Sequence, residues 1–478
     1  MFSPPAMLKL FALSFLLLGS ITGHPVKEFN SCQLSEGLLY EIRSYGPIVH
    51  KIINEIVHGR FAGQTWQSLA ELTDTFGPRM SGSQELEDAI DYVVKAMVDD
   101  GLDNVHTEDA PVPQWVRGYE RAQLVEPNRL ELPILGLGTS VGTPLGGITA
   151  DVVVVESFEE LNELPNEDVE GKIVVYVPQW VNYGVTGEYR RLGASAAARK
   201  GAVASLIRSV TQFSIGSPHT GVQSYEEDVE KIPTASITVE HAEMLLRKYR
   251  RGEKLRIHLE MQDENLGIFT SRNTIGELEG LVHKDSSVVV VSGHLDSWDV
   301  GVGAMDDAGG VMISWKALTY LNAMGLRPRR TLRAVLFTGE EQGIWGGTQY
   351  YEDHKEHGEE EFNFFFESDS GTFDPRGFGF SGNEEARCIF EEIVKLMSPL
   401  GAMEVTSSSS AGPDLSGWSN AGYPGAGLLN ANERYFWFHH SAGDSMLVED
   451  PVALDRCAAL WAATAYVIAD LSVDIPKN

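Results

Sequence analysis

The spacing of apolar residues along the chain predicts alternating strands and helices. Residues 288–291 are four consecutive valines, which is typical of a strand that is buried on both faces of a parallel sheet. After Ser83, apolar residues recur every three or four positions, which predicts an amphipathic helix that ends near Gly101. Residues 104–112 follow it as a predicted strand. This part of the chain therefore has the pattern of an α/β domain.

The same alternation of strands and helices resumes after residue 270 and continues to the end of the chain. The predicted strands are 271–277, 288–292, 332–338, 362–366 and 425–429, and the predicted helices are 308–324, 346–354, 384–397 and 451–471. Strands that alternate with helices build a mostly parallel sheet with helices on both faces. The predicted fold class is therefore α/β, with residues 46–125 and 263–478 forming one domain.

Between these two parts, residues 126–262 form a predicted β-rich α/β insert. Its short apolar runs are 133–136, 150–155, 172–177, 202–207 and 256–261, and its helical stretches are 188–200 and 239–248. The insert has one isolated candidate ligand, His219, which we interpret as a surface loop residue. We expect such an insert to supply a lid or a partner surface, and the chemistry to lie elsewhere.

The N-terminus has the pattern of a secretory signal peptide over residues 1–23. Lys9 precedes an apolar core at 10–18, and small residues follow at 19–23. The alternative, a membrane anchor, needs about 20 apolar residues, and no other stretch is expected to be long and apolar enough. We therefore expect a secretory route that leads outside the cell or to the lysosome. Residues 24–45 have little periodicity and are a possible pro-segment.

Composition narrows the choice of partners and metal ligands. A chain of 478 residues is too long for one compact core, which favours two domains. The net charge of −31 argues against nucleic acid or an anionic membrane as a partner. Three cysteines allow one internal disulfide, for which we expect Cys388 and Cys457 because Cys32 lies near the N-terminus. No C-x-x-C spacing occurs, so a bound metal must be held by histidine and carboxylate.

Polar side chains follow several predicted strands at the point where each strand ends. They are His294, with Asp306 twelve residues later, then Glu340 and Glu341, then Asp369, and finally His439 and His440. The carboxyl ends of parallel strands meet at one edge of a sheet, which is where ligands bind. Carboxylates gathered there repel one another unless cations lie between them. Two zinc ions that share one carboxylate would fit this set of ligands.

The adjacent glutamates are expected to divide two roles between them. Neighbouring side chains diverge, so one of the pair can bind metal while the other takes a proton from water as general base. The alternative is a solvated turn. Glycines at 339, 343, 346 and 347 place the pair in a tight turn after an apolar strand, which favours the functional interpretation.

Four segments resemble the di-zinc peptidases of the M28 family: SGHLDSWDVGVGAMDDAGG, FTGEEQGIWGG, ESDSGTF and FHHSAGD. The insert at 126–262 resembles the protease-associated domain of that family. The resemblance implies one zinc on His294 and Asp369, another on Glu341 and a histidine, and Asp306 as the bridge. It implies Glu340 as catalytic base, and Asp296 as the carboxylate that orients His294.

Two finer expectations also come from the resemblance. The family's last motif places a serine directly after its histidine and an aspartate four residues on, which selects His440 over His439, since Ser441 and Asp444 follow it. His439 would then be a wall or substrate contact. The family commonly has a cis peptide after the bridging aspartate, here between Asp306 and Asp307.

The resemblance further implies a secreted or lysosomal homodimer that hydrolyses unblocked dipeptides and releases the C-terminal residue. An aminopeptidase that acts on longer peptides could use the same metal centre. A non-catalytic binding protein on a peptidase fold is the alternative from another class, although the complete set of ligands and base argues against it.

Overall fold

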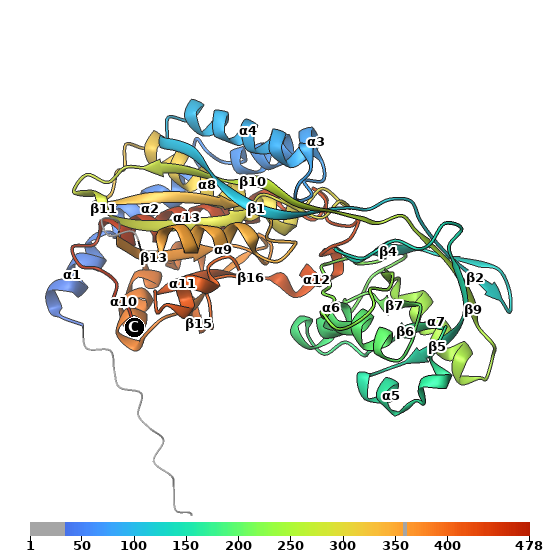
Figure 1. The fold of residues 1–478 in the computed structure, drawn as a ribbon. Helices are drawn as coiled ribbons and strands as arrows, with labels where there is room; N and C mark the ends of the chain where they lie inside the picture. Colours follow the sequence, from blue (N-terminus) through green and yellow to red (C-terminus); the bar gives the residue numbers. More distant parts are fainter. Residues whose placement is uncertain (1–33, 357–360) are drawn as a thin grey trace, which may run out of the picture.

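The computed structural model describes residues 34–356 and 361–478, which form two α/β domains joined by a pair of long strands (Figure 1). The predicted signal peptide at 1–23 lies outside the described residues. The α/β fold class with an insert is confirmed.

Within the described residues, the larger domain is built on one sheet. Its strands are β1 (Asp103–Val116), β10 (Glu264–Leu278), β11 (His283–His294), β12 (Arg330–Phe337), β13 (Glu361–Glu367), β14 (Pro375–Ser381), β15 (Glu404–Ser407) and β16 (Gly425–Asn430). Their order is β1-β10-β12-β11-β13-β16-β14-β15. The central strands β12, β11, β13 and β16 are parallel, whereas β10 joins β12, and β14 joins β16, in antiparallel pairs. The parallel centre brings the carboxyl ends of four strands to one edge.

Helices cover both faces of this sheet. One face carries α1 (Glu36–Ser44), α2 (Gly46–Val57), α3 (Gln64–Phe76), α4 (Gln84–Asp99), α8 (Gly309–Ala323), α10 (Glu384–Val394) and α13 (Pro451–Asp470). The other face carries α9 (Trp345–His354) and α11 (Ser416–Asn420). The four valines of β11 alternate between the two cores: Val289 and Val291 face the first, and Val288 and Val290 the second. The four valines are therefore all apolar because the strand is buried on both faces, as predicted.

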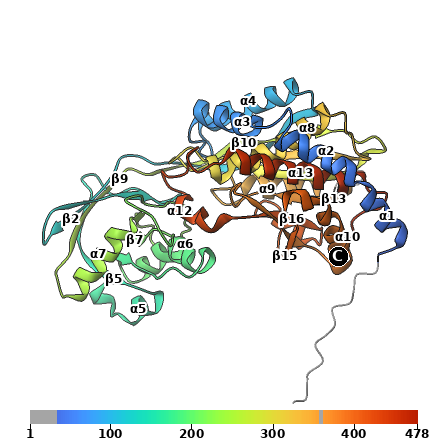
Figure 2. The same cartoon turned by 180° about the vertical axis from the view of Figure 1, so that it is seen from behind.

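Helix α13 corrects one expectation about membrane segments. Its 20 residues are long and apolar enough to cross a membrane, although no such stretch beyond the N-terminus was expected. However, 89% of its apolar window is buried inside the protein, where it packs beside α2 and α8 (Figure 2). Its hydrophobicity is that of a central core helix.

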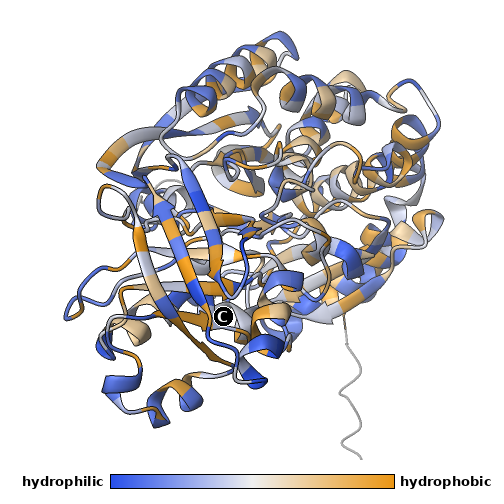
Figure 3. Cartoon of the chain, turned by 90° about the vertical axis from the view of Figure 1, so that its right-hand side faces the viewer, coloured by the Kyte–Doolittle hydropathy of each residue, from blue (hydrophilic) through white to orange (hydrophobic). Residues whose placement is uncertain are grey.

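The insert forms a second sheet with its own core. Its strands are β2 (Glu120–Glu126), β3 (Leu130–Leu132), β4 (Ile134–Gly136), β5 (Ile148–Val155), β6 (Ile173–Tyr176), β7 (Ala204–Arg208), β8 (Thr234–Ile237) and β9 (Arg256–Met261), and its helices are α5 (Phe158–Glu163), α6 (Tyr183–Arg199) and α7 (Val239–Arg250). Strands β5 to β8 are parallel neighbours. Buried positions alternate along β9, as the bands of hydrophobic and hydrophilic residues in Figure 3 illustrate. The long strands β1 and β10 pair with each other and connect the insert to the larger domain.

One helix was not predicted, and one predicted disulfide is wrong. Residues 36–44, which have little periodicity in the sequence, form helix α1, whose Ile42 is buried in the main core. Cys457 is a free thiol that donates a hydrogen bond to the carbonyl oxygen of Phe373 at 3.1 Å, whereas Cys388 is disulfide-bonded. The predicted Cys388–Cys457 pair therefore does not form, because the α13 thiol points into the core.

Candidate metal centre

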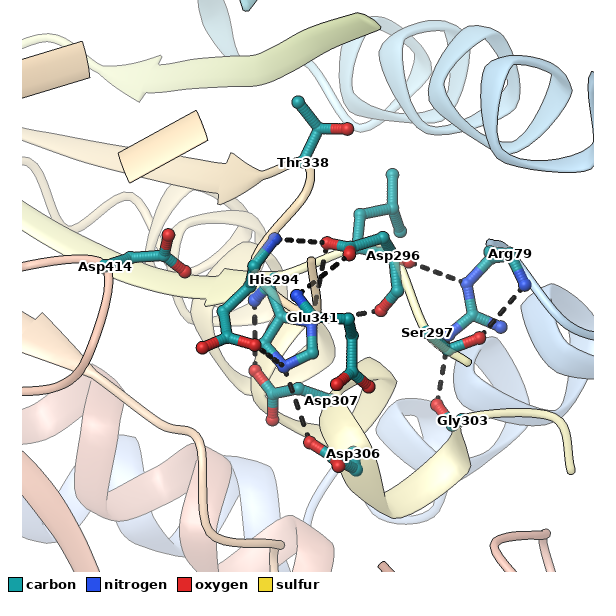
Figure 4. Close-up of polar contacts among 12 residues, drawn as sticks. Arg79, His294, Asp296, Ser297, Gly303, Asp306, Asp307, Thr338, Glu341 and Asp414 are labelled. Carbon is teal, nitrogen blue, oxygen red and sulfur yellow. Dashed lines mark hydrogen bonds and ion pairs between the residues drawn. The ribbon is translucent and has the colours of Figure 1, made fainter. Parts of the chain in front are cut away.

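The predicted site residues meet at the carboxyl edge of the larger sheet. His294 is the last residue of β11, Glu340 and Glu341 follow the end of β12 in the chain, and Asp369 follows β13. His440 arrives from the short helix α12 (Tyr435–Phe438), at a residue with a positive φ of 57°. Residues up to 146 positions apart in sequence, from His294 to His440, thus line one site. Figure 4 shows three of them, His294, Asp306 and Glu341, side by side.

Asp306 lies between two groups of possible ligands. Its Oδ1 is 3.4 Å from His294 Nε2, which is 3.3 Å from Asp369 Oδ1. Its Oδ2 is 3.4 Å from His440 Nε2, which in turn lies 2.8 Å from Glu341 Oε2. Each oxygen of this one carboxylate therefore faces a different histidine and carboxylate, which is the arrangement of a bridging ligand.

The chemistry of these side chains fits divalent metal ions. His294 Nε2 and Asp306 Oδ2 are buried and have no hydrogen-bond partner among the described residues. A buried polar atom without a partner is costly, and coordination of a metal would satisfy both atoms. A set of imidazole nitrogens and carboxylate oxygens is a typical zinc environment.

The acidity of the site supports the same interpretation. Burial, with repulsion from neighbouring carboxylates, raises the pKa of Glu340 and of Glu341 well above the usual range. Burial also raises the pKa of Asp369, to about 6. Glu340 and Glu341 would therefore hold protons at neutral pH without a cation, and metal ions would keep them ionised.

Comparison with known proteins identifies the family. The sequence profile of peptidase family M28 matches residues 273–465, and that of the PA domain matches residues 148–245. Carboxypeptidase Q of Xenopus laevis is 51% identical over 437 residues, which cover 91% of this chain and 92% of the relative. Carboxypeptidase Q of Homo sapiens is 49% identical, with 93% of each chain covered. The chain belongs to peptidase family M28.

Solved structures agree with this assignment. The peptidase M28 precursor of Shewanella amazonensis superposes with a TM-score of 0.87 at 31% identity, covering 91% of this chain and 99% of that one. The aminopeptidase of Aneurinibacillus sp. strain AM-1 has the same fold, with a TM-score of 0.62 at 19% identity. This M28 chain is a zinc-dependent peptide hydrolase, as its motifs predicted.

In this M28 peptidase, Asp296 holds two ligand-bearing segments together. Its carboxylate accepts hydrogen bonds from the backbone N–H groups of Glu340 and Glu341, both at 3.2 Å. Its backbone carbonyl oxygen lies 3.0 Å from His294 Nδ1, whereas its carboxylate Oδ1 is 3.6 Å away. Asp296 thus contacts His294 mainly through its carbonyl group, and its carboxylate positions the glutamate pair.

The residues around Asp306 fix its backbone. The peptide bond between Asp306 and Asp307 is cis, as the family resemblance implied. The carboxylate of Asp307 accepts hydrogen bonds from His294 N at 3.1 Å and Gly310 N at 3.2 Å, so its oxygens are occupied by the backbone. The carboxylate of Asp444 accepts from Met305 N and Asp306 N. Asp307 is therefore a structural residue beside the metal centre.

The two adjacent histidines both approach Asp306. His439 Nε2 lies 3.4 Å from Asp306 Oδ2, the same distance as His440 Nε2, and the two rings stack with centroids 3.4 Å apart. Glu341 Oε2 lies 2.8 Å from His440 Nε2. Distance to Asp306 does not separate the two histidines, whereas the contact with Glu341 favours His440 as the ligand.

Arg79 is a site residue that the sequence did not reveal. Its fully buried guanidinium donates hydrogen bonds to the carbonyl oxygens of Leu295 and Val302 and to that of Gly303, which Figure 4 shows beside it. These residues belong to the loop between His294 and Asp306. Arg79 therefore holds the loop in shape from a helix-linking segment more than 200 residues earlier in the chain.

The insert contributes directly to the site. A cavity of about 360 Å³ is lined by most of the metal-centre residues, including Asp306 and His440, together with Tyr183, Arg190 and Val222 of the insert. His219, expected on the surface, is 2% exposed, and its Nδ1 lies 2.6 Å from the carbonyl oxygen of His439. The insert is thus more than a lid, because it contacts the segment that carries the histidine ligands.

Proposed function

We propose that this chain is a two-zinc carboxypeptidase that hydrolyses unblocked dipeptides. The observation that carries the proposal is the position of Asp306, whose two oxygens face His294 and His440 separately. His294 and Asp369 would hold one zinc ion, and Glu341 and His440 the other. The name of the relatives, carboxypeptidase Q, supports release of a C-terminal residue.

The reaction would use Glu340 as its proton carrier. Bound zinc ions would lower the pKa of a water molecule and polarise the peptide carbonyl group. Glu340 lines the cavity with its Oε2 4.0 Å from His294 Nε2, and Asp296 fixes its backbone N–H. From there its carboxylate takes the proton of the attacking water and passes it to the leaving amine.

Arg190 would recognise the C-terminal carboxylate of the substrate. Among the described residues that line the cavity, it is the sole lysine or arginine. Arg190 is 4% exposed, and its Nε has no hydrogen-bond partner among the described residues. A guanidinium pairs well with a carboxylate, and such charge-assisted bonds are strong where water is excluded. The small volume of the cavity, about 360 Å³, favours substrates as short as dipeptides.

Four related substrates test this specificity. We expect rapid hydrolysis of a free dipeptide, and slow hydrolysis of its C-terminal amide, its N-acetyl form and a free tetrapeptide. A chelator should abolish every activity. Equal turnover of the dipeptide, its amide and the tetrapeptide would instead favour an aminopeptidase, and no turnover of any of them would favour a binding protein.

An arginine variant tests the proposed contact itself. Arg190→Met should lower kcat/KM for the free dipeptide about 10- to 150-fold, because hydrogen bonds to charged groups contribute about 1.5–3 kcal/mol. The amide should be affected much less, since it carries no charge for Arg190 to bind. Loss of both activities to the same degree would contradict a role in carboxylate recognition.

We propose a secretory route and a homodimer for this peptidase. The pattern at residues 1–23 and the net charge of −31 support an extracellular or lysosomal location. We place the end of any removable pro-segment before α1, because Ile42 is part of the main core. N-terminal sequencing of the secreted protein and its sedimentation velocity test these points: a mature N-terminus within or after α1, or a monomer, would contradict them.

A further inference from the structure

The insert binds the backbone of the segment that carries the two histidines. Thr211 Oγ1 donates to the carbonyl oxygen of Phe436 at 2.5 Å, and Thr220 N donates to that of His440 at 2.9 Å. Between these bonds, His219 Nδ1 contacts the carbonyl oxygen of His439. The helix that precedes the histidines, α12, is only four residues long. Three successive contacts from another domain therefore hold a segment with little structure of its own.

Aromatic packing accompanies these hydrogen bonds. Tyr183 of the insert stacks on Phe436 with ring centroids 4.9 Å apart, and Phe213 packs on Trp437 at the same distance. Desolvated aromatic pairs add stability beyond their buried area. The histidine segment is thus fixed to the insert through both its backbone and its side chains.

The insert also sets which nitrogen of His440 is available to a metal. His440 Nδ1 lies 3.2 Å from the carbonyl oxygen of Thr220. Arg190 Nη1 lies farther from this nitrogen, at 3.5 Å. The nearer partner of Nδ1 is the carbonyl oxygen, which only accepts hydrogen bonds, so it favours a proton on Nδ1 and leaves Nε2, which faces Glu341, free. A partner of this kind on the non-ligating nitrogen orients the ring of a metal-binding histidine.

The other histidine of the centre has its partner much closer in sequence. His294 Nδ1 contacts the carbonyl oxygen of Asp296, two residues away in the same loop. The partner of His440 comes from residue 220, in the insert. The two halves of the metal centre therefore differ: the His294 half is supported within the larger domain, and the His440 half depends on the docked insert.

We propose that the insert is part of the second metal site, with His219 and Thr220 as positioning residues for His440. Docking of the insert and binding of metal at Glu341 and His440 then stabilise each other, because coupling between two equilibria is reciprocal. The proposal rests on the two-zinc centre of the proposed function. If the insert were not docked, binding of the second zinc would be weakened selectively, and the first zinc would stay bound.

Substitution of His219 tests the proposal through zinc binding. His219→Leu keeps the approximate size of the ring and removes the hydrogen bond to His439, whereas the amide of His219→Asn can still donate it. Zinc bound per chain is measured in buffers of graded free zinc. His219→Leu should weaken the second zinc about 10-fold or more, as for other partners of metal ligands. The affinity for the first zinc should stay unchanged, and His219→Asn should restore most of the affinity for the second zinc.

A histidine elsewhere in the insert provides the matched control. His258 lies on β9, where its Nδ1 contacts Thr149 Oγ1 on β5 within the insert sheet. His258→Leu should leave both zinc affinities unchanged. Equal zinc affinities in His219→Leu and the wild type, with circular dichroism showing a folded protein, would overturn the proposal. Equal weakening by His258→Leu would overturn it too.

The wild-type protein gives a second test that does not depend on a variant folding. Hydrogen exchange of peptides that cover residues 211–222 and 433–440 is compared at one and at two equivalents of zinc. The second equivalent should slow exchange in both segments, and unchanged exchange would contradict the proposed coupling. A wild-type protein that binds a single zinc would refute the two-zinc centre itself, which separates the failure of the proposed function from the failure of this inference.

Discussion

Asp306 is the residue on which both halves of the metal centre depend. It is 4% exposed, and its two oxygens face different histidines. The neighbouring groups hold this geometry by binding its backbone: Asp444 accepts from its N–H, and Arg79 fixes the loop that leads to it. A single carboxylate can therefore be shared by two cations without any movement of the chain.

Replacement of this carboxylate should remove both metals. Asp306→Asn keeps the shape but loses the charge that would hold two cations, so we expect fewer than one zinc per chain and no measurable turnover. Asp307→Asn is the matched comparison, because Asp307 bonds to the backbone only. It should keep both zinc ions, although the protein should be less stable. Metal analysis of the dialysed proteins checks both results.

Glu340 and Glu341 are adjacent, but their substitution should have different effects on zinc binding and turnover. Glu340→Gln should lower kcat at least 10²- to 10⁴-fold, the usual contribution of a general base, while both zinc ions stay bound. Glu341→Gln should instead lose one zinc, because Glu341 contacts His440. Turnover and zinc content measured on the same samples separate the two roles. Retained activity in Glu340→Gln would contradict its role as base.

At the scale of the elements, α1 belongs to the core of the larger domain. Ile42 is 1% exposed, and the carboxylate of Glu41 accepts hydrogen bonds from both the backbone and the side chain of Ser472 near the C-terminus. The two ends of the described chain thus meet on one side of the sheet. A helix in this position packs against α10 and α2 and so stabilises this side of the domain.

Truncation of the α1 contact should destabilise the protein. Ile42→Ala should lower the free energy of unfolding by about 2–5 kcal/mol, as for other large-to-small changes in a packed core. Tyr40, which is 78% exposed on the same helix, is the control, and Tyr40→Ala should change stability by less than about 0.5 kcal/mol. Thermal or denaturant unfolding of both variants tests this. Equal stability would mean that α1 does not contribute to the core.

The elements that sequence predicted well are those with a strong apolar period. The valine strand, the helix after Ser83 and the helix of residues 451–471 all occur near their expected bounds. The misses have physical causes. Strand β8 was not predicted because it contains the polar residues Thr234 and Ser236, although all four of its residues are buried. Helix α1 was not predicted because it is short and has a single buried residue. Tertiary packing determines such segments more than local pattern does.

The sequence predicted those residues of the site that lie at strand ends of the larger domain. His294, Glu340, Glu341 and Asp369 meet because parallel strands share an edge. Arg190 and His219 were missed because their roles come from the docking of two domains. Arg190 contacts a residue 250 positions later, and no periodicity in the sequence encodes such a contact.

At the scale of the whole molecule, a buried acidic pair lies where the insert joins the larger domain. Glu120 begins β2, and Asp263 lies between β9 and β10. Burial and repulsion from Glu120 raise the pKa of Asp263 to about 9. Beside them Arg117 bonds to both Glu120 and Asp299, so the pair lies next to a link between the two domains. Protonation at this junction therefore affects how firmly the domains are joined.

This pair should make the protein more stable in acid than at neutral pH. An unfolded aspartate has a pKa near 3.9, so between about pH 4 and pH 9 the folded state binds the extra proton. The stabilisation is complete below pH 4 and is lost as the pH rises toward 9, by at most on the order of 1 kcal/mol per pH unit.

Asp263→Asn tests the sign of this effect. The variant mimics the protonated form, so its Tm should decline less than that of the wild type between pH 5 and pH 7.5. Scanning calorimetry at the two pH values provides the measurement. A wild-type Tm that rises with pH over this range, by an amount that Asp263→Asn abolishes, would contradict the assigned protonation.

The central claim is that distant strand ends and the histidine segment place two metal ions on either side of Asp306. Anomalous diffraction from crystals of the zinc-loaded protein, recorded above and below the zinc absorption edge, tests it most directly. We predict two anomalous peaks about 3.5–4 Å apart, one beside His294 and Asp369 and one beside Glu341 and His440. A single peak, or peaks away from Asp306, would contradict the two-metal account.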